Sequence, residues 1–166
     1  MTEPDADIAT LVRRIAAALT AKSARLAVAE SCTGGWLAKV LTDQPGSSQW
    51  FGYGFVTYSD EAKQAILGVS GETLAHRGAV SEDVAEQMAT GARLASAAEI
   101  AVAITGIAGP DGGSTAKPTG TVCFAWAGPG VQLCSTTRRF DGDRAAVRRQ
   151  SVVAALEGVL VQLTVP

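Results

Sequence analysis

The sequence predicts an α/β domain in which helices cover both faces of a mixed, mainly parallel β-sheet. Short apolar runs of strand length alternate along the chain with segments whose apolar residues recur at helical spacing. Two strand-like runs, Thr119–Ala127 and Gln132–Phe140, are separated only by Gly128-Pro129-Gly130, a pattern typical of an antiparallel hairpin. The length of 166 residues suits one domain, so we expect residues 1–166 to fold as a single unit.

Each expected element follows from a local signal such as apolar spacing, a capping residue or a Gly/Pro turn. Helices are predicted over Ala6–Thr20, Trp36–Leu41 and Glu61–Leu67, with a helical turn at Thr73–His76, a helix opening at Ser81-Glu82-Asp83 and a last helix from near Asp143. Strands are predicted at Arg25–Ala29, Trp50–Tyr58 and Glu99–Thr105, besides the hairpin. The fifth helix should bury Val84, Met88, Ala92 and Ala95, and the last one Val152, Leu156, Val159 and Leu163.

Composition narrows the function classes. The chain is 47 % hydrophobic and 18 % charged, with only 5 % aromatic residues and 18 glycines, so we expect close helix–sheet packing by small side chains. A net charge of −2 gives no support to a general nucleic-acid binder. Three cysteines and a single histidine, His76, argue against a disulfide framework, a zinc site or most histidine-based triads. The acidic Met1–Asp7 and the lack of a long apolar run favour a soluble, cytoplasmic protein.

Three loops leave the carboxyl ends of predicted strands, where ligands of open α/β sheets collect. They are Glu30–Gly35, Tyr58–Lys63 and Thr105–Gly113. In the first loop, Ser31 or Thr33 is either a nucleophile, beside amides that Gly34 and Gly35 bring close to a ligand, or the N-cap of the next helix. The neighbouring Cys32 is a rival nucleophile or an inert buried thiol.

Lys63 falls in the first turn of its predicted helix, where the macrodipole disfavours a cation. A general base needs the pKa of this amine lowered from about 10.4 to near 7–8, which takes roughly 4 kcal/mol. The dipole supplies only about 0.3–1 kcal/mol, so burial must supply most of the shift. The alternatives are a solvated surface lysine and, for Tyr58, a packing residue at the strand end.

The loop Thr105–Gly113 carries Gly106, Gly109, Gly112 and Gly113, whose amides could bind a phosphate or a carbonyl oxygen, unless the loop is simply a turn. Asp111 in the same loop is either a ligand or a turn residue.

Arg144 and Arg148 lie four residues apart near the start of the last helix, where two cations oppose the dipole unless an anion lies close by. They indicate a phosphate or carboxylate site, or else an exposed pair bridged to Asp141 or Asp143.

Six segments in order carry a resemblance to a known family. They are AESCTGG (Ala29–Gly35), FVTYSDEAK (Phe55–Lys63), GAVSE (Gly78–Glu82), TGIAGPDGG (Thr105–Gly113), KPTGTV (Lys117–Val122) and GDRAAVR (Gly142–Arg148). Together they resemble the CinA C-terminal domain family, over nearly the whole chain from Ile8 to Leu163. The resemblance implies a three-layer α/β/α sandwich. It also implies a nicotinamide-nucleotide amidohydrolase, which deamidates nicotinamide mononucleotide in pyridine nucleotide salvage without a cofactor or metal.

The resemblance also implies roles for single residues. Ser31 matches the family nucleophile, Lys63 the base and Tyr58 an assisting hydroxyl, which agrees with a chain that has one histidine. Substrate binding and oxyanion stabilisation fall to Thr33, Gly34, Gly35, Thr105, Gly106 and Gly109. Arg144 matches the arginine of the GDR motif, where we expect contact with the substrate phosphate.

Other expectations concern partners. Many family members carry a preceding nucleotide-binding domain, so activities credited to it, such as ADP-ribose pyrophosphatase, should be absent here. Trp36, Trp50 and Phe51, taken as exposed, predict a homo-oligomer, a dimer or higher. The alternative function is a non-enzymatic partner protein associated with competence or DNA damage, although an acidic pI of about 5.4 counts against direct DNA contact. A nucleotide-binding module without turnover is a third option.

Overall fold

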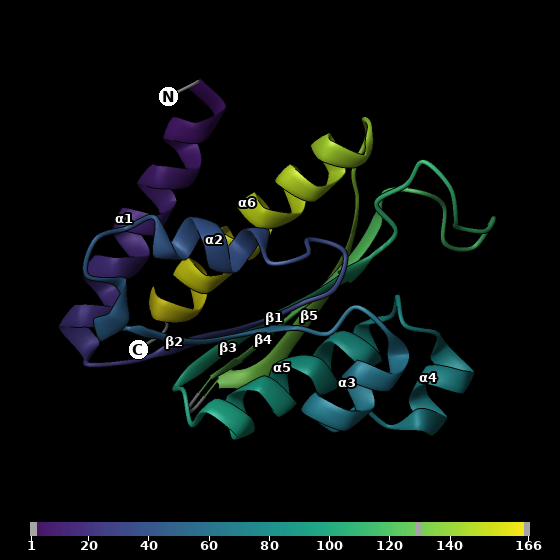
Figure 1. Ribbon diagram of the computed structural model, residues 1–166, viewed down its shortest axis with the longest axis horizontal. Helices are drawn as coiled ribbons and strands as arrows, with labels where there is room; N and C mark the ends of the chain where they lie inside the picture. Colours follow the sequence, from purple (N-terminus) through teal and green to yellow (C-terminus); the bar gives the residue numbers. More distant parts are fainter. Residues whose placement is uncertain (1–2, 129–130, 165–166) are drawn as a thin grey trace.

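The computed structural model describes residues 3–128 and 131–164, which form a sheet between two layers of helices (Figure 1). In chain order the elements are α1 (Glu3–Lys22), β1 (Leu26–Glu30), α2 (Trp36–Thr42), the 3₁₀ turn η1 (Ser47–Gln49), β2 (Phe51–Val56), α3 (Asp60–Leu67), α4 (Gly71–Arg77), α5 (Glu82–Ser96), β3 (Ile100–Gly106), β4 (Thr121–Gly128), β5 (Val131–Arg139) and α6 (Arg144–Thr164). Within these residues, no helix has the length and apolar character needed to cross a lipid bilayer.

The sheet has the strand order β2-β1-β3-β4-β5. The ladders of β1 with β2 and with β3 are parallel, whereas those of β4 with β3 and with β5 are antiparallel. The predicted mixed sheet and terminal hairpin are therefore confirmed. The predicted turn Gly128-Pro129-Gly130 contains residues outside the described ranges.

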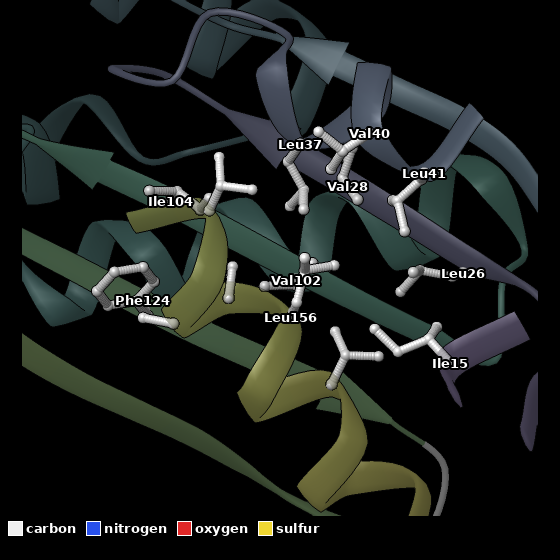
Figure 2. Close-up of a cluster of buried hydrophobic side chains, with 14 of the residues drawn as sticks. Ile15, Leu26, Val28, Leu37, Val40, Leu41, Val102, Ile104, Phe124 and Leu156 are labelled. Carbon is white, nitrogen blue, oxygen red and sulfur yellow. The ribbon is translucent and has the colours of Figure 1, made fainter. Parts of the chain in front are cut away.

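Large and small side chains are segregated to opposite faces of the three central strands. One face presents Leu26, Val28, Ile100, Val102, Ile104, Val122, Phe124 and Trp126. This face packs against α1, α2 and α6, and Figure 2 shows its aliphatic core around Val102 and Leu156. The other face presents Ala27, Ala29, Ala101, Ala103, Cys123, Ala125 and Ala127 to the layer that contains α5. Helices on both faces confirm the three-layer sandwich.

The alanine face allows α5 to lie close to the sheet, and Gly91 allows it to lie close to the end of α3. A Cβ atom built on Gly91 of α5 would lie 1.9 Å from the carbonyl oxygen of Leu67, so only glycine fits at this crossing. The close packing expected from the glycine- and alanine-rich composition is thus confirmed.

Most predicted elements lie within a few residues of the observed bounds, but the predicted exposure of some side chains is wrong. Ala95 is exposed, because α5 buries a face defined by Val84, Ala85, Met88, Ala89 and Ala92. Trp50 is only 2 % exposed, because its side chain joins the core on the α1, α2 and α6 side of the sheet. Trp36 and Phe51, also taken as exposed, are partly buried and pack against the same core, so the expected exposed aromatic surface is not present at these positions.

Candidate active site

The three loops expected to converge do meet at one edge of the sheet. Glu30, the last residue of β1, pairs with Val56 of β2 and Ile104 of β3, so the residues that follow emerge side by side. The backbone continues this alignment, since Ser31 N–H donates to Ile104 O at 3.0 Å and Thr57 N–H to Glu30 O at 2.9 Å. The loops and Arg144 line a cleft of about 300 Å³ at the carboxyl ends of the parallel strands.

Ser31 and Lys63 face one another in this cleft. Lys63 Nζ lies 3.2 Å from Ser31 Oγ, 2.9 Å from Thr57 O and 3.3 Å from Tyr58 O. The chain turns sharply at Ser59, whose hydroxyl accepts from Ala62 N–H and caps α3, and this turn brings Lys63 back over the end of β2. The lysine side chain is only 1 % exposed, so the solvated surface lysine considered above is excluded.

Burial lowers the pKa of Lys63, and nearby Asp60 opposes that effect in part. No carboxylate pairs with the Lys63 amine among the described residues. A neutral amine has two N–H groups and one lone pair. If the N–H groups donate to the carbonyls of Thr57 and Tyr58, the lone pair is directed at the Ser31 hydroxyl. The geometry therefore suits proton transfer from Ser31 to Lys63.

Glu30 is a residue of this site that the sequence did not single out. Its carboxylate is fully buried and accepts four hydrogen bonds at the amino end of α2. Oε2 accepts from the Thr33 hydroxyl at 2.6 Å and from the amides of Gly35 and Leu37, and Oε1 accepts from the amide of Ala38 at 2.9 Å. A charge at the end of an apolar strand that leads into a helix is the signal that could have found it.

Thr33, Gly34 and Gly35 lie behind Ser31 and do not line the cleft. The Thr33 hydroxyl and the Gly35 amide are engaged by Glu30, and the Gly34 amide donates to Ser31 O at 3.0 Å. Their expected part in substrate binding stays a prediction. Both glycines have positive φ values, 60° for Gly34 and 94° for Gly35, a conformation that suits glycine at this turn.

Arg148 holds the same turn from α6. Its guanidinium donates to Cys32 O at 3.1 Å and to Thr33 O at 2.9 Å, and it lies 5.5 Å from the ring centroid of Trp36. A cation at the start of α6 was expected to need a nearby anion. For Arg148, the carbonyl oxygens of Cys32 and Thr33 supply the negative partial charge instead. Within the described residues, neither Arg148 nor Arg144 forms an ion pair with Asp141 or Asp143.

The cleft is also lined by Thr105, Gly106, Gly109, Tyr58 and Arg144. Their expected roles in substrate binding and catalysis stay predictions. Arg144 donates to Gly109 O at 2.7 Å and to the Tyr58 hydroxyl at 3.1 Å, and Thr105 donates to Ala79 O at 2.8 Å. The Tyr58 side chain is 60 % exposed, and its hydroxyl contacts Arg144 rather than Ser31 or Lys63 in the described structure. Its assisting role stays a prediction.

Cys32 also borders the cleft but is a poor rival to Ser31. Burial raises the pKa of its thiol to about 11, which disfavours the reactive thiolate. In the described part of the chain, no group of three or more His, Cys, Asp or Glu side chains is placed to hold a metal ion.

A larger hollow of about 470 Å³ lies between α1 and α2. Its walls come mainly from Ile8, Val12, Trp36 and Val40, with a rim that includes the surface ion pair between Lys39 and Asp43. It contains no buried nucleophile or base. The smaller cleft, where Ser31 and Lys63 meet, is therefore the candidate active site.

The fold and this cleft define the class: an α/β enzyme with a serine and a buried lysine at the carboxyl edge of its sheet. The chain belongs to the CinA C-terminal domain family, whose model matches residues 8–163. A nicotinamide-nucleotide amidohydrolase PncC from Escherichia coli K12 is 55 % identical over 158 residues, covering 92 % of this chain and 93 % of that protein. A protein of the same name from Pseudomonas putida is 53 % identical over 153 residues, covering 92 % and 95 %.

A solved structure agrees with this kinship. The crystal structure of a competence-damaged protein (CinA) superfamily protein from Klebsiella pneumoniae superimposes with a TM-score of 0.90 at 45 % identity. The match covers 94 % of this chain and 97 % of that one. The family resemblance carried by the six sequence motifs is therefore confirmed across nearly the whole domain.

Proposed function

We propose that this chain is a nicotinamide-nucleotide amidohydrolase, which converts nicotinamide mononucleotide to nicotinic acid mononucleotide and ammonia in pyridine nucleotide salvage. The observation that carries the proposal is the buried Lys63 amine 3.2 Å from Ser31 Oγ in an open cleft. It is supported by relatives at 53–55 % identity that are named for this activity. The whole chain would act as a single domain in the cytoplasm.

In the first half of the proposed reaction, Ser31 Oγ attacks the carboxamide carbon while neutral Lys63 takes the hydroxyl proton. The tetrahedral intermediate then expels ammonia, with the proton returned from Lys63, assisted by the Tyr58 hydroxyl. The product left on the enzyme is an ester of Ser31. Water then attacks this ester with Lys63 again as base, and the carboxylate leaves as Ser31 recovers its proton.

The oxyanion needs donors near the attacked carbon. Cys32 and Gly106 line the cleft, whereas the amides of Gly34 and Gly35 are engaged within the turn. We assign the oxyanion to the backbone amide of Cys32, with that of Gly106 as the alternative. Arg144, which also lines the cleft, is the proposed partner of the phosphate.

The test measures ammonia release from nicotinamide mononucleotide, with and without a chelator, for the wild type and for Ser31→Ala and Lys63→Ala. We expect both variants to fold and to lose about 10⁴-fold or more in kcat, as nucleophile and base variants do in other hydrolases. Lys39→Ala, which removes an exposed lysine that does not line the cleft, is the matched control and should retain activity. Full activity in purified Ser31→Ala would refute the mechanism.

The same preparation tests the alternatives. Salt-sensitive DNA binding without ammonia release would favour the competence-associated partner protein, and tight nucleotide binding without turnover would favour a binding module. We also propose self-association, because Tyr53 and Val56 remain exposed along the edge strand β2. Sedimentation equilibrium tests it, and a strictly monomeric protein at high concentration would exclude it.

A further inference from the structure

Glu30 takes no part in the proposed bond-making steps, yet it is fully buried one residue before the nucleophile. A buried carboxylate is costly unless hydrogen bonds compensate for its lost hydration. Here four donors do so, and all of them belong to the segment from Thr33 to Ala38. The carboxylate therefore ties the end of β1 to the turn and to the first turn of α2.

Arg148 binds the same turn through the turn's carbonyl oxygens. Its two hydrogen bonds reach the carbonyl oxygens of Cys32 and Thr33, and its position over Trp36 fixes the guanidinium against α2. Glu30 thus binds N–H and hydroxyl donors of the turn, while Arg148 binds its carbonyl acceptors. Glu30 belongs to β1 and Arg148 to α6, so two different elements hold the same turn by hydrogen bonds.

We propose that Glu30 and Arg148 are positioning residues, which together hold the Ser31 turn (residues 31–35) so that Ser31 Oγ stays within reach of Lys63. The proposal rests on the proposed function for its catalytic consequence. The turn needs such support because two of its five residues are glycines with positive φ, which lend it little stiffness. A displacement of roughly 1 Å between reacting groups can cost about 100-fold in rate.

The test uses two variants, each with a matched control. In Glu30→Gln, the side-chain NH₂ replaces one acceptor oxygen and must face a donor, either the Ala38 amide or the group around Oε2. Its control is Glu99→Gln, where an exposed carboxylate accepts from Arg25 N–H, ahead of β1.

Arg148→Met removes the guanidinium from the opposite side of the turn. Its control is Arg138→Met, which breaks an exposed ion pair with Glu157 away from the cleft. If Glu30→Gln does not fold, Thr33→Val takes its place, since it removes only the hydroxyl bound to Glu30.

Three measurements separate positioning from simple stabilisation. Amide hydrogen exchange over residues 31–38 should rise at least about tenfold in both variants under native conditions. The rate of Ser31 phosphonylation by a fluorophosphonate and kcat for nicotinamide mononucleotide should both fall by about 100-fold. The KM should change less than about threefold, because these residues do not line the cleft. Both controls should match the wild type.

Variants with lower unfolding stability but wild-type kcat and phosphonylation rate would show a structural role only and overturn the proposal. Unchanged exchange over residues 31–38 would overturn it as well. A wild type that releases no ammonia and resists phosphonylation would refute the proposed function, and the catalytic role of the two residues with it. Hydrogen exchange would still report separately whether they hold the turn.

Discussion

Replacing Lys63 by methionine tests the central electrostatic feature of the site. The change removes the buried amine but keeps an unbranched side chain of similar length. We expect ammonia release to be lost, because the proposed base is gone. The more searching result is the effect on stability, because Lys63 is only 1 % exposed and burial lowers the pKa of its amine below the ordinary value of 10.5.

The sign follows from proton linkage. Between the lowered pKa of the folded protein and 10.5 in the unfolded chain, Lys63 binds a proton more readily when the protein is unfolded. The wild type therefore gains stability as pH rises through this window, and it loses that gain as pH falls through the folded pKa. For one whole proton the slope is about 1.4 kcal/mol per pH unit. Lys63→Met lacks this titrating amine, so its free energy of unfolding does not gain this dependence on pH. The difference in stability between Lys63→Met and wild type should therefore favour the variant most at low pH and decline as pH rises toward 10.5.

Urea unfolding of both proteins at several pH values between about 6 and 10 measures the difference. A constant offset is expected as well, because methionine leaves the carbonyls of Thr57 and Tyr58 without their donor. The offset changes the height of the curve and not its slope. If wild type and Lys63→Met give parallel curves across the range, burial does not depress the pKa of Lys63 and the case for a neutral base fails.

Three further changes test other parts of the site. Arg144→Gln should raise the KM for nicotinamide mononucleotide by about 10- to 100-fold in steady-state assays, the worth of a charge-assisted hydrogen bond. An unchanged KM would separate Arg144 from the phosphate. Cys32→Ala should keep kcat within a few fold, because a thiol with a pKa of about 11 is only about one part in 10⁴ thiolate at pH 7. Loss of activity with an intact fold would reinstate Cys32 as nucleophile. Thr57→Val should raise the free energy of unfolding by about 1 kcal/mol, since the buried Thr57 hydroxyl has no hydrogen-bond partner among the described residues and the carbonyl that holds Lys63 remains. A clear loss of stability on urea unfolding would show that this hydroxyl is satisfied after all.

The fold was largely predictable because its signals are local. Alternation of large and small residues, as in Ile100–Gly106, places β3 in the sheet and already separates its two faces. Capping residues such as Ser59 and Ser81 fix helix starts within a residue or two. The errors arose where contacts between segments distant in sequence decide burial. Trp50 joins the core on the α1, α2 and α6 side of the sheet, and Ala95 is exposed because α5 turns a different side to the alanine face.

Strand topology and motif resemblance predicted part of the site, and contacts between distant segments determine the rest. Ser31 and Lys63 follow strands that lie side by side, so their meeting follows from the parallel register. The hydrogen bonds of Arg148 to Cys32 and Thr33 span more than 100 residues of sequence, and no local pattern encodes them. The contacts of Arg144 are not encoded locally either. Its sequence position shows only a cation at the start of a helix, whereas its hydrogen-bond partners are Gly109 O and the Tyr58 hydroxyl.

The position of Glu30 also bears on how the proposed substrate must lie. In many α/β proteins the amides at the start of the helix after the first strand bind phosphate. Here the amides of Gly35, Leu37 and Ala38 already bind a carboxylate from the chain itself. A nucleotide phosphate therefore finds the amides at the start of α2 already engaged, and Arg144, which lines the cleft, remains as its proposed cationic partner. With the phosphate held by Arg144, the opposite end of the nucleotide, which carries the carboxamide, is left to face Ser31 Oγ and the Lys63 amine.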